Sequence, residues 1–274
     1  MTGRGERLAN YVILVVFAAF AIGPILSILT TALGPDDSAD GVDGAVVAGL
    51  HVGNFAAAWD LGHFGSYLRT SLMVSVFVVV VALVLSVLSG YALGTMAFRG
   101  ATVVFYLFLL GIMMPAEAIV VPLYFDLRTV GLTDTFWAIA LPQVAQSVAF
   151  GTFWMRAYFR SSSRALVEAA RLDGASTFGV LWRVLVPIAR PAITTLTVLI
   201  FMWTWNEFLI PLVMVTSESL RTAPLGLAFF QGQRTQGFTL LAAGAVIVAT
   251  PVVVLYLFLQ RHFIAGMLEG AVRE

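Results

Sequence analysis

A polar segment between two long apolar runs, residues 160–187, carries ionisable side chains spaced to lie together on one face of a helix. Arg164, Glu168 and Arg171 fall at positions i, i+4 and i+7, which share one face of a helix. Gly174 follows, and glycine accepts the positive φ of a chain reversal without steric cost. The pattern predicts a short charged helix, a glycine break and a second amphipathic piece, after which Pro187 starts the next apolar segment. An ordinary surface loop containing an amphipathic helix is the alternative.

Polar side chains inside the apolar runs are the second set of candidate functional residues. Gln143, Gln146 and Ser147 share one helical face, and they either hydrogen-bond between helices or line a binding site; we favour the former. Asn206 and Glu207 lie about 15 residues into a later run, roughly 23 Å along a helix. Glu207 is therefore either an acid near the membrane surface or a polar contact along a transport pathway.

Two further patterns concern packing and placement. Ser86, Gly90 and Gly94 repeat at intervals of four, which predicts a small-residue face where another helix approaches closely. Trp203 and Trp205 precede the polar pair and are expected as anchors at the membrane surface.

Composition indicates an integral membrane protein. Of 274 residues, 60% are hydrophobic and 11% are charged, whereas a soluble domain has about 25% charged residues. The chain has no cysteine, which excludes disulfides, thiolate metal sites and cysteine nucleophiles. It has no lysine either, which excludes a Walker A phosphate loop and Schiff-base chemistry. Because His51, His63 and His262 are scattered, we expect no metal site and no catalytic residue, and we set aside a membrane-embedded enzyme.

The apolar runs predict an all-α integral membrane protein of one domain, residues 1–274, with six transmembrane helices. About 20 apolar residues are enough to cross a bilayer. The first run exceeds the apolar region of a signal peptide, so we expect it to be retained. The predicted spans are about 11–33, 71–98, 102–123, 136–158, 191–215 and 238–259, with the region 160–187 between the fourth and fifth.

The arginines predict the orientation. Six spans place both termini on one side of the membrane. If that side is cytoplasmic, the outer segments carry four of the fifteen basic residues, Arg69, Arg128, Arg221 and Arg234, and the inner segments carry the other eleven. Cytoplasmic segments are enriched in basic residues. We therefore expect both termini and the region 160–187 in the cytoplasm, with the aspartate-rich connection 34–65 outside.

The region 160–187 also resembles a known motif, E-A-A, three residues, G, nine residues, then I-x-L-P. Here the motif is met by Glu168, Ala169, Ala170 and Gly174, then Val184, Val186 and Pro187. This is similar to the cytoplasmic coupling motif of membrane subunits of binding-protein-dependent ABC importers. Valines stand where the family has isoleucine and leucine, and Ser161–Ser163 replace an acid-containing lead-in.

Three other segments resemble one branch of these importers, the MalG-like permease subunits of carbohydrate ABC importers. WNEFLIPLV at residues 205–213 resembles the W-N-E-F segment of the branch. The ending RHFIAGMLEGAVRE resembles its R-x-F-x-x-G-x-x-x-G-A-V-K tail, and YLRTSLMVS at 67–75 resembles Y-x-x-N-S-L-x-V-S, with Thr70 in place of asparagine.

The resemblance implies a permease subunit that forms half of a translocation pathway in a bacterial cytoplasmic membrane. The implied partners are a second permease, two copies of a cytoplasmic ABC ATPase and an extracytoplasmic solute-binding protein. The chain itself would bind no cofactor, because the ATPase uses the ATP. The residues implied in coupling are Glu168, Ala169, Ala170, Asp173, Gly174 and Pro187, and Asn206 and Glu207 are pathway candidates.

A stand-alone secondary solute transporter is the alternative function. It would use Glu117 and Glu207 for proton coupling and predicts internal inverted repeats. No such repeat is visible in the sequence, and the coupling motif would have no role.

Overall fold

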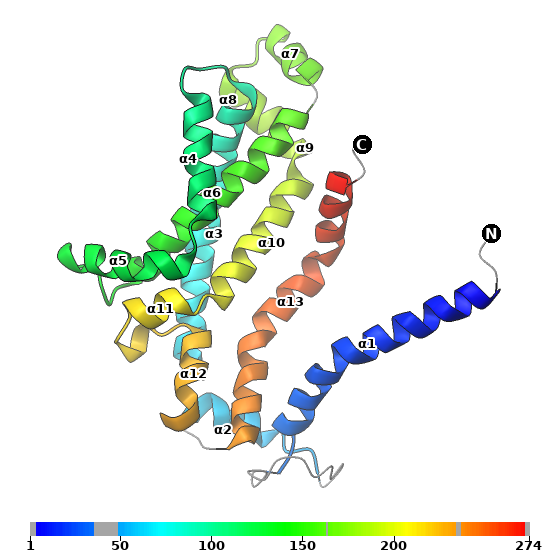
Figure 1. The fold of residues 1–274 in the computed structure, drawn as a ribbon, viewed down its shortest axis with the longest axis vertical. Coiled ribbons are helices and arrows are strands. Elements are labelled where there is room, and N and C mark those ends of the chain that lie inside the picture. The colour runs from blue at the N-terminus through cyan, green and yellow to red at the C-terminus, as the bar shows by residue number, and fades with distance from the viewer. Residues whose placement is uncertain (1–3, 36–48, 163, 234–236, 272–274) are drawn as a thin grey trace. The chain divides into compact units, whose positions relative to one another are not determined.

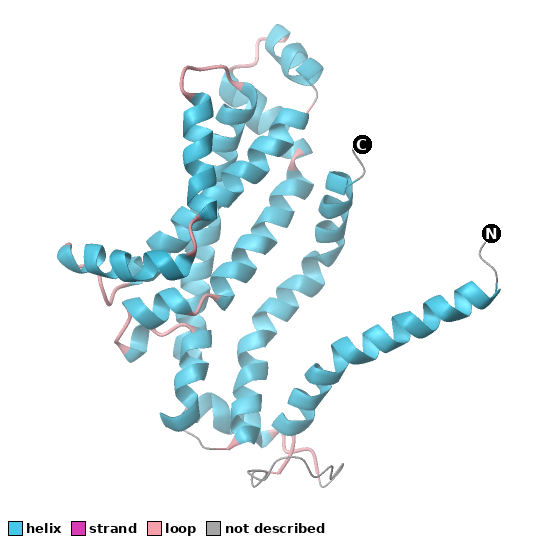
Figure 2. Cartoon of the chain, in the orientation of Figure 1, coloured by secondary structure: helices cyan, strands magenta, loops and turns pink. Residues whose placement is uncertain are grey.

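The computed structural model describes residues 4–35, 49–162, 164–233 and 237–271, and these parts are helices joined by loops, with no strand among them (Figure 1, Figure 2). The chain divides into two compact units, residues 1–65 with 226–250 and residues 66–225 with 251–274. The aspartates at positions 36–43 and the final residues of the tail lie outside the described residues.

The first unit is organised around α1 (Arg4–Ala32), α2 (Gly53–Leu61) and adjoining parts of α12 (Ala223–Gln233) and α13 (Phe238–Ala271). Asn54 closes the end of α1, because its side-chain amide donates to the backbone oxygens of Ala32 and Gly34, both at 2.9 Å. Phe64 is fully buried, and its ring meets Phe230 edge-on with 5.4 Å between centroids. By contrast, the side chains of residues 5–28 are exposed, so α1 offers an apolar surface that the other described residues of its unit do not cover.

The second unit contains most of α3 (Phe64–Thr95) and the helices between it and α12. In chain order these are α4 (Ala101–Met113), α5 (Ala116–Thr129), α6 (Phe136–Ser161), α7 (Arg164–Leu172), α8 (Thr177–Gly179), the π-helix η1 (Val180–Leu185), α9 (Val186–Ile188), α10 (Arg190–Asn206), α11 (Leu209–Met214) and the 3-10 helix η2 (Glu218–Leu220). Its apolar core draws on several of them, including Val78 of α3, Met155 of α6, Leu181 of η1 and Leu196 of α10.

The predicted small-residue face of α3 is confirmed, and α6 packs against it. A Cβ added at Gly90 would lie 2.6 Å from the Cβ of Met155 and 2.9 Å from the backbone nitrogen of Arg156. The hydroxyls of Ser89 and Thr152 hydrogen-bond across the same interface at 2.6 Å. These contacts fix α6, which carries the predicted polar face, against α3.

Three helices are long and apolar enough to cross a membrane by length and composition, namely the segments Gly5–Ala32, Phe64–Thr95 and Phe238–Gln260. Two bent pairs raise the number to five if each pair is one span. α6 spans 26 residues, but polar side chains such as Gln143 and Gln146 interrupt its apolar sequence. The six-span count therefore stays a prediction.

The third span, predicted over residues 102–123 with interruptions at Gly111, Pro115 and Pro122, is formed by two helices. α4 ends at Met113 and α5 begins at Ala116, with a bend of 100° between them. Pro115 has no amide hydrogen to continue α4, and the residue before it, Met114, has the extended backbone that proline imposes. Beyond the bend, α5 packs against α11.

The structure also refines two other predicted segments. The fifth span was predicted over about 191–215, and within it α10 ends at Asn206 and α11 starts at Leu209. Between the last two predicted spans, residues 216–237, the structure adds the helix α12, with a kink at Gln231 and Gly232. The kink lies where the backbone of Gly232 has a positive φ of +86°.

Candidate functional site

The charged segment forms a separate short helix, α7, at one end of the second unit (Figure 1). Val167 and Ala170 fall three residues apart, on one face, and pack against the apolar core. Glu168 and Ala169 lie on the exposed side. Among the described side chains Glu168 makes no ion pair, and the side chain of Arg164 lies outside them. α7 is thus anchored along one face and leaves its acidic residue accessible.

The glycine break after α7 has the geometry predicted from its sequence. Gly174 has φ +83°, the left-handed conformation in which glycine avoids a steric penalty. The N–H of Ala175 donates to the oxygen of Ala170 at 2.9 Å, and the N–H of Gly174 donates to that of Arg171 at 3.0 Å. These two bonds form a Schellman motif, which satisfies carbonyls at the end of the helix. Asp173 precedes the glycine and is exposed.

The space around Gly174 is open on this chain's side. A Cβ added there would meet no atom of the described residues within 4 Å. Large apolar side chains nearby are also uncovered: Leu172 is 89% exposed, Phe178 66% and Trp182 47%. Exposed apolar groups gathered beside charged ones are typical of protein–protein contact sites.

Pro187 does not start the next long helix, contrary to the sequence prediction. It lies in the short helix α9, and α10 begins after a bend of 78°, with Pro191 in its first turn. The bend is held from α6: the hydroxyl of Tyr158 donates to the oxygen of Ile188 at 2.9 Å, and the indole N–H of Trp154 donates to that of Ala192 at 3.1 Å. The motif therefore ends one turn before the bend.

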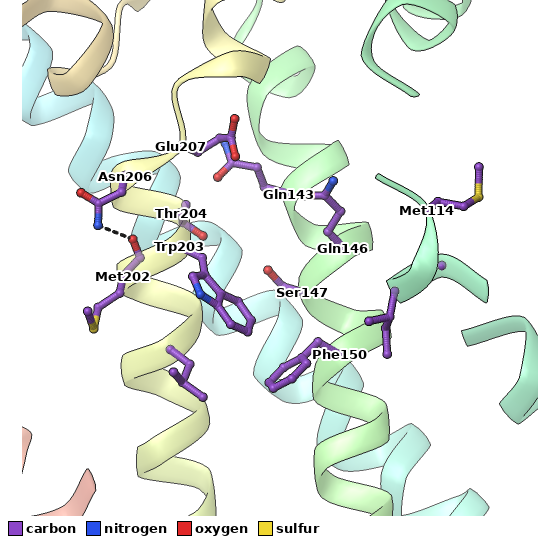
Figure 3. A pocket seen from close by; sticks show the side chains of 13 residues that line it. Met114, Gln143, Gln146, Ser147, Phe150, Met202, Trp203, Thr204, Asn206 and Glu207 are labelled. Carbon is purple, nitrogen blue, oxygen red and sulfur yellow. Dashed lines mark hydrogen bonds between the residues drawn. The ribbon is translucent and has the colours of Figure 1, made fainter. Parts of the chain in front are cut away.

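The second set of predicted residues lines a cavity of about 480 Å³ among α4, α6 and α10 (Figure 3). Both pathway candidates and all three polar residues of α6 belong to its lining. The lining residues are Gly111, Ile112, Met114, Gln143, Gln146, Ser147, Phe150, Leu199, Met202, Trp203, Thr204, Asn206 and Glu207. The prediction that Gln143 hydrogen-bonds between helices is not supported, because its side-chain amide donates to the oxygen of Ile139 in its own helix.

Glu207 occupies the break between α10 and α11. Its backbone is extended, with ψ 123°, so the helix stops before it. One carboxylate oxygen accepts the N–H of Ile210 at 3.0 Å, which satisfies a free donor in the first turn of α11. The side chain of Asn206 turns back along α10 and donates to the oxygen of Met202 at 2.8 Å (Figure 3).

The two tryptophans have different surroundings, and one expectation is wrong. Trp205 is 2% exposed and stacks on Phe201, so it is part of the core rather than a membrane anchor. Trp203 is 48% exposed and forms a wall of the cavity, where Phe150 meets its ring edge-on at 4.8 Å (Figure 3). Sequence reasoning did not assign Phe150, although it extends the face of Gln143 at helical spacing.

Other ionisable residues are not brought into this cavity. Glu117, proposed as a proton-coupling partner of Glu207, lies in the first turn of α5 and is not among the lining residues. The described residues contain no group of three His, Asp or Glu side chains that could hold a metal ion.

The sequence matches a family model described as "Binding-protein-dependent transport system inner membrane component" over residues 11–269. The chain belongs to this family. The match includes α7, the glycine break, the cavity and the break at Glu207, so both candidate sites lie within the family's shared region.

Individual members of the family show how far the similarity extends. The probable ABC transporter permease protein YurM of Bacillus subtilis is 35% identical over 223 residues, which cover 81% of this chain and 74% of the relative. The trehalose transport system permease protein SugB of Mycobacterium tuberculosis is 30% identical, and the alignment covers 98% and 99% of the two chains. A solved bacterial ABC transporter involved in the import of the acidic polysaccharide alginate shares 25% identity and a TM-score of 0.80 over 96% of this chain and 99% of its own.

Proposed function

We propose that this chain is a permease subunit of an ATP-driven carbohydrate importer and forms half of its translocation pathway. Support comes from the family and from the names of its members, which include permeases for trehalose and for arabinooligosaccharides. The implied assembly contains a second permease, two copies of a cytoplasmic ABC ATPase and an extracytoplasmic solute-binding protein. In this assembly the ATPase, not this chain, binds ATP.

The observation that carries the proposal is the presentation of α7. Its inner face is held by the core through Val167 and Ala170, while Glu168 and the almost fully exposed Leu172 face away. A helix displayed in this way can enter a groove on a partner, where a leucine supplies apolar contact and a carboxylate can pair with a basic side chain. We assign this docking role to Glu168, Ala169, Asp173 and Gly174, and Ala170 supports it by holding the inner face of the helix on the core.

The segment that follows α7 suggests how a movement of α7 is transmitted to α10. α8, η1 and α9 follow the glycine and lead to the bend that α6 holds through Tyr158 and Trp154. A displacement of α7 therefore acts on α10 through a short, hydrogen-bonded connection. Because the cavity lies between α6 and α10, this connection links the docking helix to the candidate pathway.

The arginine distribution supports an orientation with both termini in the cytoplasm, on the same side of the membrane as α7. With that orientation, α7 faces the compartment that holds ATP, and the break at Glu207 lies toward the outer side.

The test is to purify an affinity-tagged chain from its native membrane in mild detergent and to identify the proteins that co-elute. We expect a second permease of the same family and an ABC ATPase. Elution without an ATPase, from membranes that still take up sugar, would contradict the proposal and favour a secondary transporter.

A further inference from the structure

The cavity among α4, α6 and α10 combines an aromatic wall, five uncharged polar side chains and one carboxylate. We propose that it is a subsite by which this chain itself holds a neutral sugar ring during transport, and that it disfavours anionic sugars. The inference rests on the proposed transport function and adds to it the chemical class of the cargo.

The wall has a form that suits a sugar ring. About 480 Å³ lies within the range of small-molecule pockets. Trp203 presents about half of its surface, and Phe150 fixes its ring edge-on from the neighbouring helix. A pyranose has faces made of C–H groups, which pack against the negative face of an indole. A held indole loses little conformational freedom when it binds a ligand.

The polar groups suit hydroxyls. Gln143, Gln146 and Ser147 project from α6 into the lining (Figure 3). Amide and hydroxyl groups contain both donors and acceptors, as the hydroxyls of a sugar do. The amide nitrogen of Asn206 is already bonded to Met202, which leaves its oxygen as an acceptor. The indole N–H of Trp203 has no acceptor among the described residues and is a further donor.

The charge of the lining disfavours the binding of anionic sugars in the cavity. Glu207 is the one ionisable residue among the thirteen, and no basic residue accompanies it. An anionic sugar would bring a second negative charge into a partly enclosed, low-dielectric site with no counter-charge. The chain is similar to an alginate importer, but we do not expect this site to bind an acidic substrate.

The experiment uses the assembled permease–ATPase complex in lipid nanodiscs, washed free of binding protein. Saturation-transfer difference NMR detects weak sugar binding without knowledge of the natural cargo. The probes are methyl α-D-glucopyranoside and methyl α-D-glucuronopyranoside, which differ by a hydroxymethyl group against a carboxylate. We expect a signal from the glucoside above that of empty nanodiscs, and a smaller or absent signal from the glucuronide.

Two variants tie the signal to this cavity. Trp203→Leu removes the wall and should lower the glucoside signal, whereas Trp137→Leu, at a tryptophan of similar exposure outside the lining, should leave it unchanged. Glu207→Gln keeps an oxygen for the N–H of Ile210 but removes the charge, so the glucuronide signal should rise toward that of the glucoside.

Three outcomes would overturn the inference: equal signals from both probes in the wild type, a glucoside signal that survives Trp203→Leu, or no glucoside signal at all. ATP hydrolysis by the same preparation separates these results from a failure of the proposed function. A complex that hydrolyses ATP but gives one of these outcomes is still an importer, with its sugar contacts elsewhere.

Discussion

Asp134 and Ser217 join two loops that lie 83 residues apart in the sequence. One carboxylate oxygen of Asp134 accepts the backbone N–H groups of Thr216 and Ser217 at 3.0 and 2.9 Å, and the other accepts the hydroxyl of Ser217. Its own N–H donates to the oxygen of Met214 at 2.9 Å. The loop before α6 is thereby tied to the chain that follows α11.

These bonds favour the ionised carboxylate. The hydroxyl and then the backbone N–H of Ser217 lower the pKa of Asp134 from 3.8 to about 2. Because the pKa is lower in the folded protein, the stabilisation is complete above 3.8 and is lost as the pH falls toward 2. We predict that Asp134→Asn lowers the thermal unfolding midpoint by a few degrees at neutral pH, and that the difference narrows as the pH falls from about 4 to 3 and further toward 2.

The control for Asp134 is Asp126→Asn, because Asp126 is exposed near the end of α5. It should leave the unfolding midpoint unchanged at each pH. If Asp134→Asn lowered the unfolding midpoint by the same amount from pH 7 to pH 3, the contact between the two loops would depend on the shape of the side chain rather than on its charge.

The close approach of α3 and α6 gives a second prediction. Gly90→Ala forces a Cβ to within 2.6 Å of Met155, and overpacking of this kind costs about 1–3 kcal/mol. We expect less monodisperse protein in size-exclusion chromatography and a lower unfolding midpoint. Gly23→Ala adds the same atom where nothing lies within 4 Å and should behave as wild type. Equal stability of the two variants would mean that α3 and α6 can move apart freely.

The sequence predicted α7 and its glycine break well because both depend on local interactions. The Schellman bonds join residues within one turn, and Gly174 is the residue type that such an ending requires. The close packing at Gly90 was also predictable, since small residues at intervals of four leave room for one neighbouring helix and few alternatives.

The cavity could not be predicted in the same way. Gln143 and Trp203 become neighbours only when α6 packs against α10, and the carboxylate of Glu207 caps the start of α11 by accepting the N–H of Ile210. Pro115 indicated a break in the third span, but the direction of α5 depends on its packing against α11. Such contacts are tertiary, and no local pattern fixes them.

Orientation gives a third prediction. The chain has no native cysteine, so single cysteines can be introduced without background. Ser219 and Ser161 are both exposed, in η2 and at the end of α6. Ser219→Cys should react with an impermeant thiol reagent added to intact cells, and Ser161→Cys should react only after the membrane is opened. Reaction of Ser161→Cys from outside would place α7 away from the ATPase and reverse the proposed orientation.

The most direct test of the coupling role of α7 is Gly174→Val, compared with Gly131→Val. Both glycines have positive φ, +83° and +69°, and neither has an atom within 4 Å of an added Cβ. Valine should therefore cause similar strain at each, on the order of 1–2 kcal/mol, but only Gly174 borders the docking surface.

The measurement is the amount of ABC ATPase that stays bound to each purified variant at equal membrane level, together with ATP hydrolysis stimulated by the binding protein. Gly174→Val should lose ATPase or its stimulation, while Gly131→Val keeps both. Wild-type ATPase retention and stimulation with Gly174→Val would contradict the coupling role.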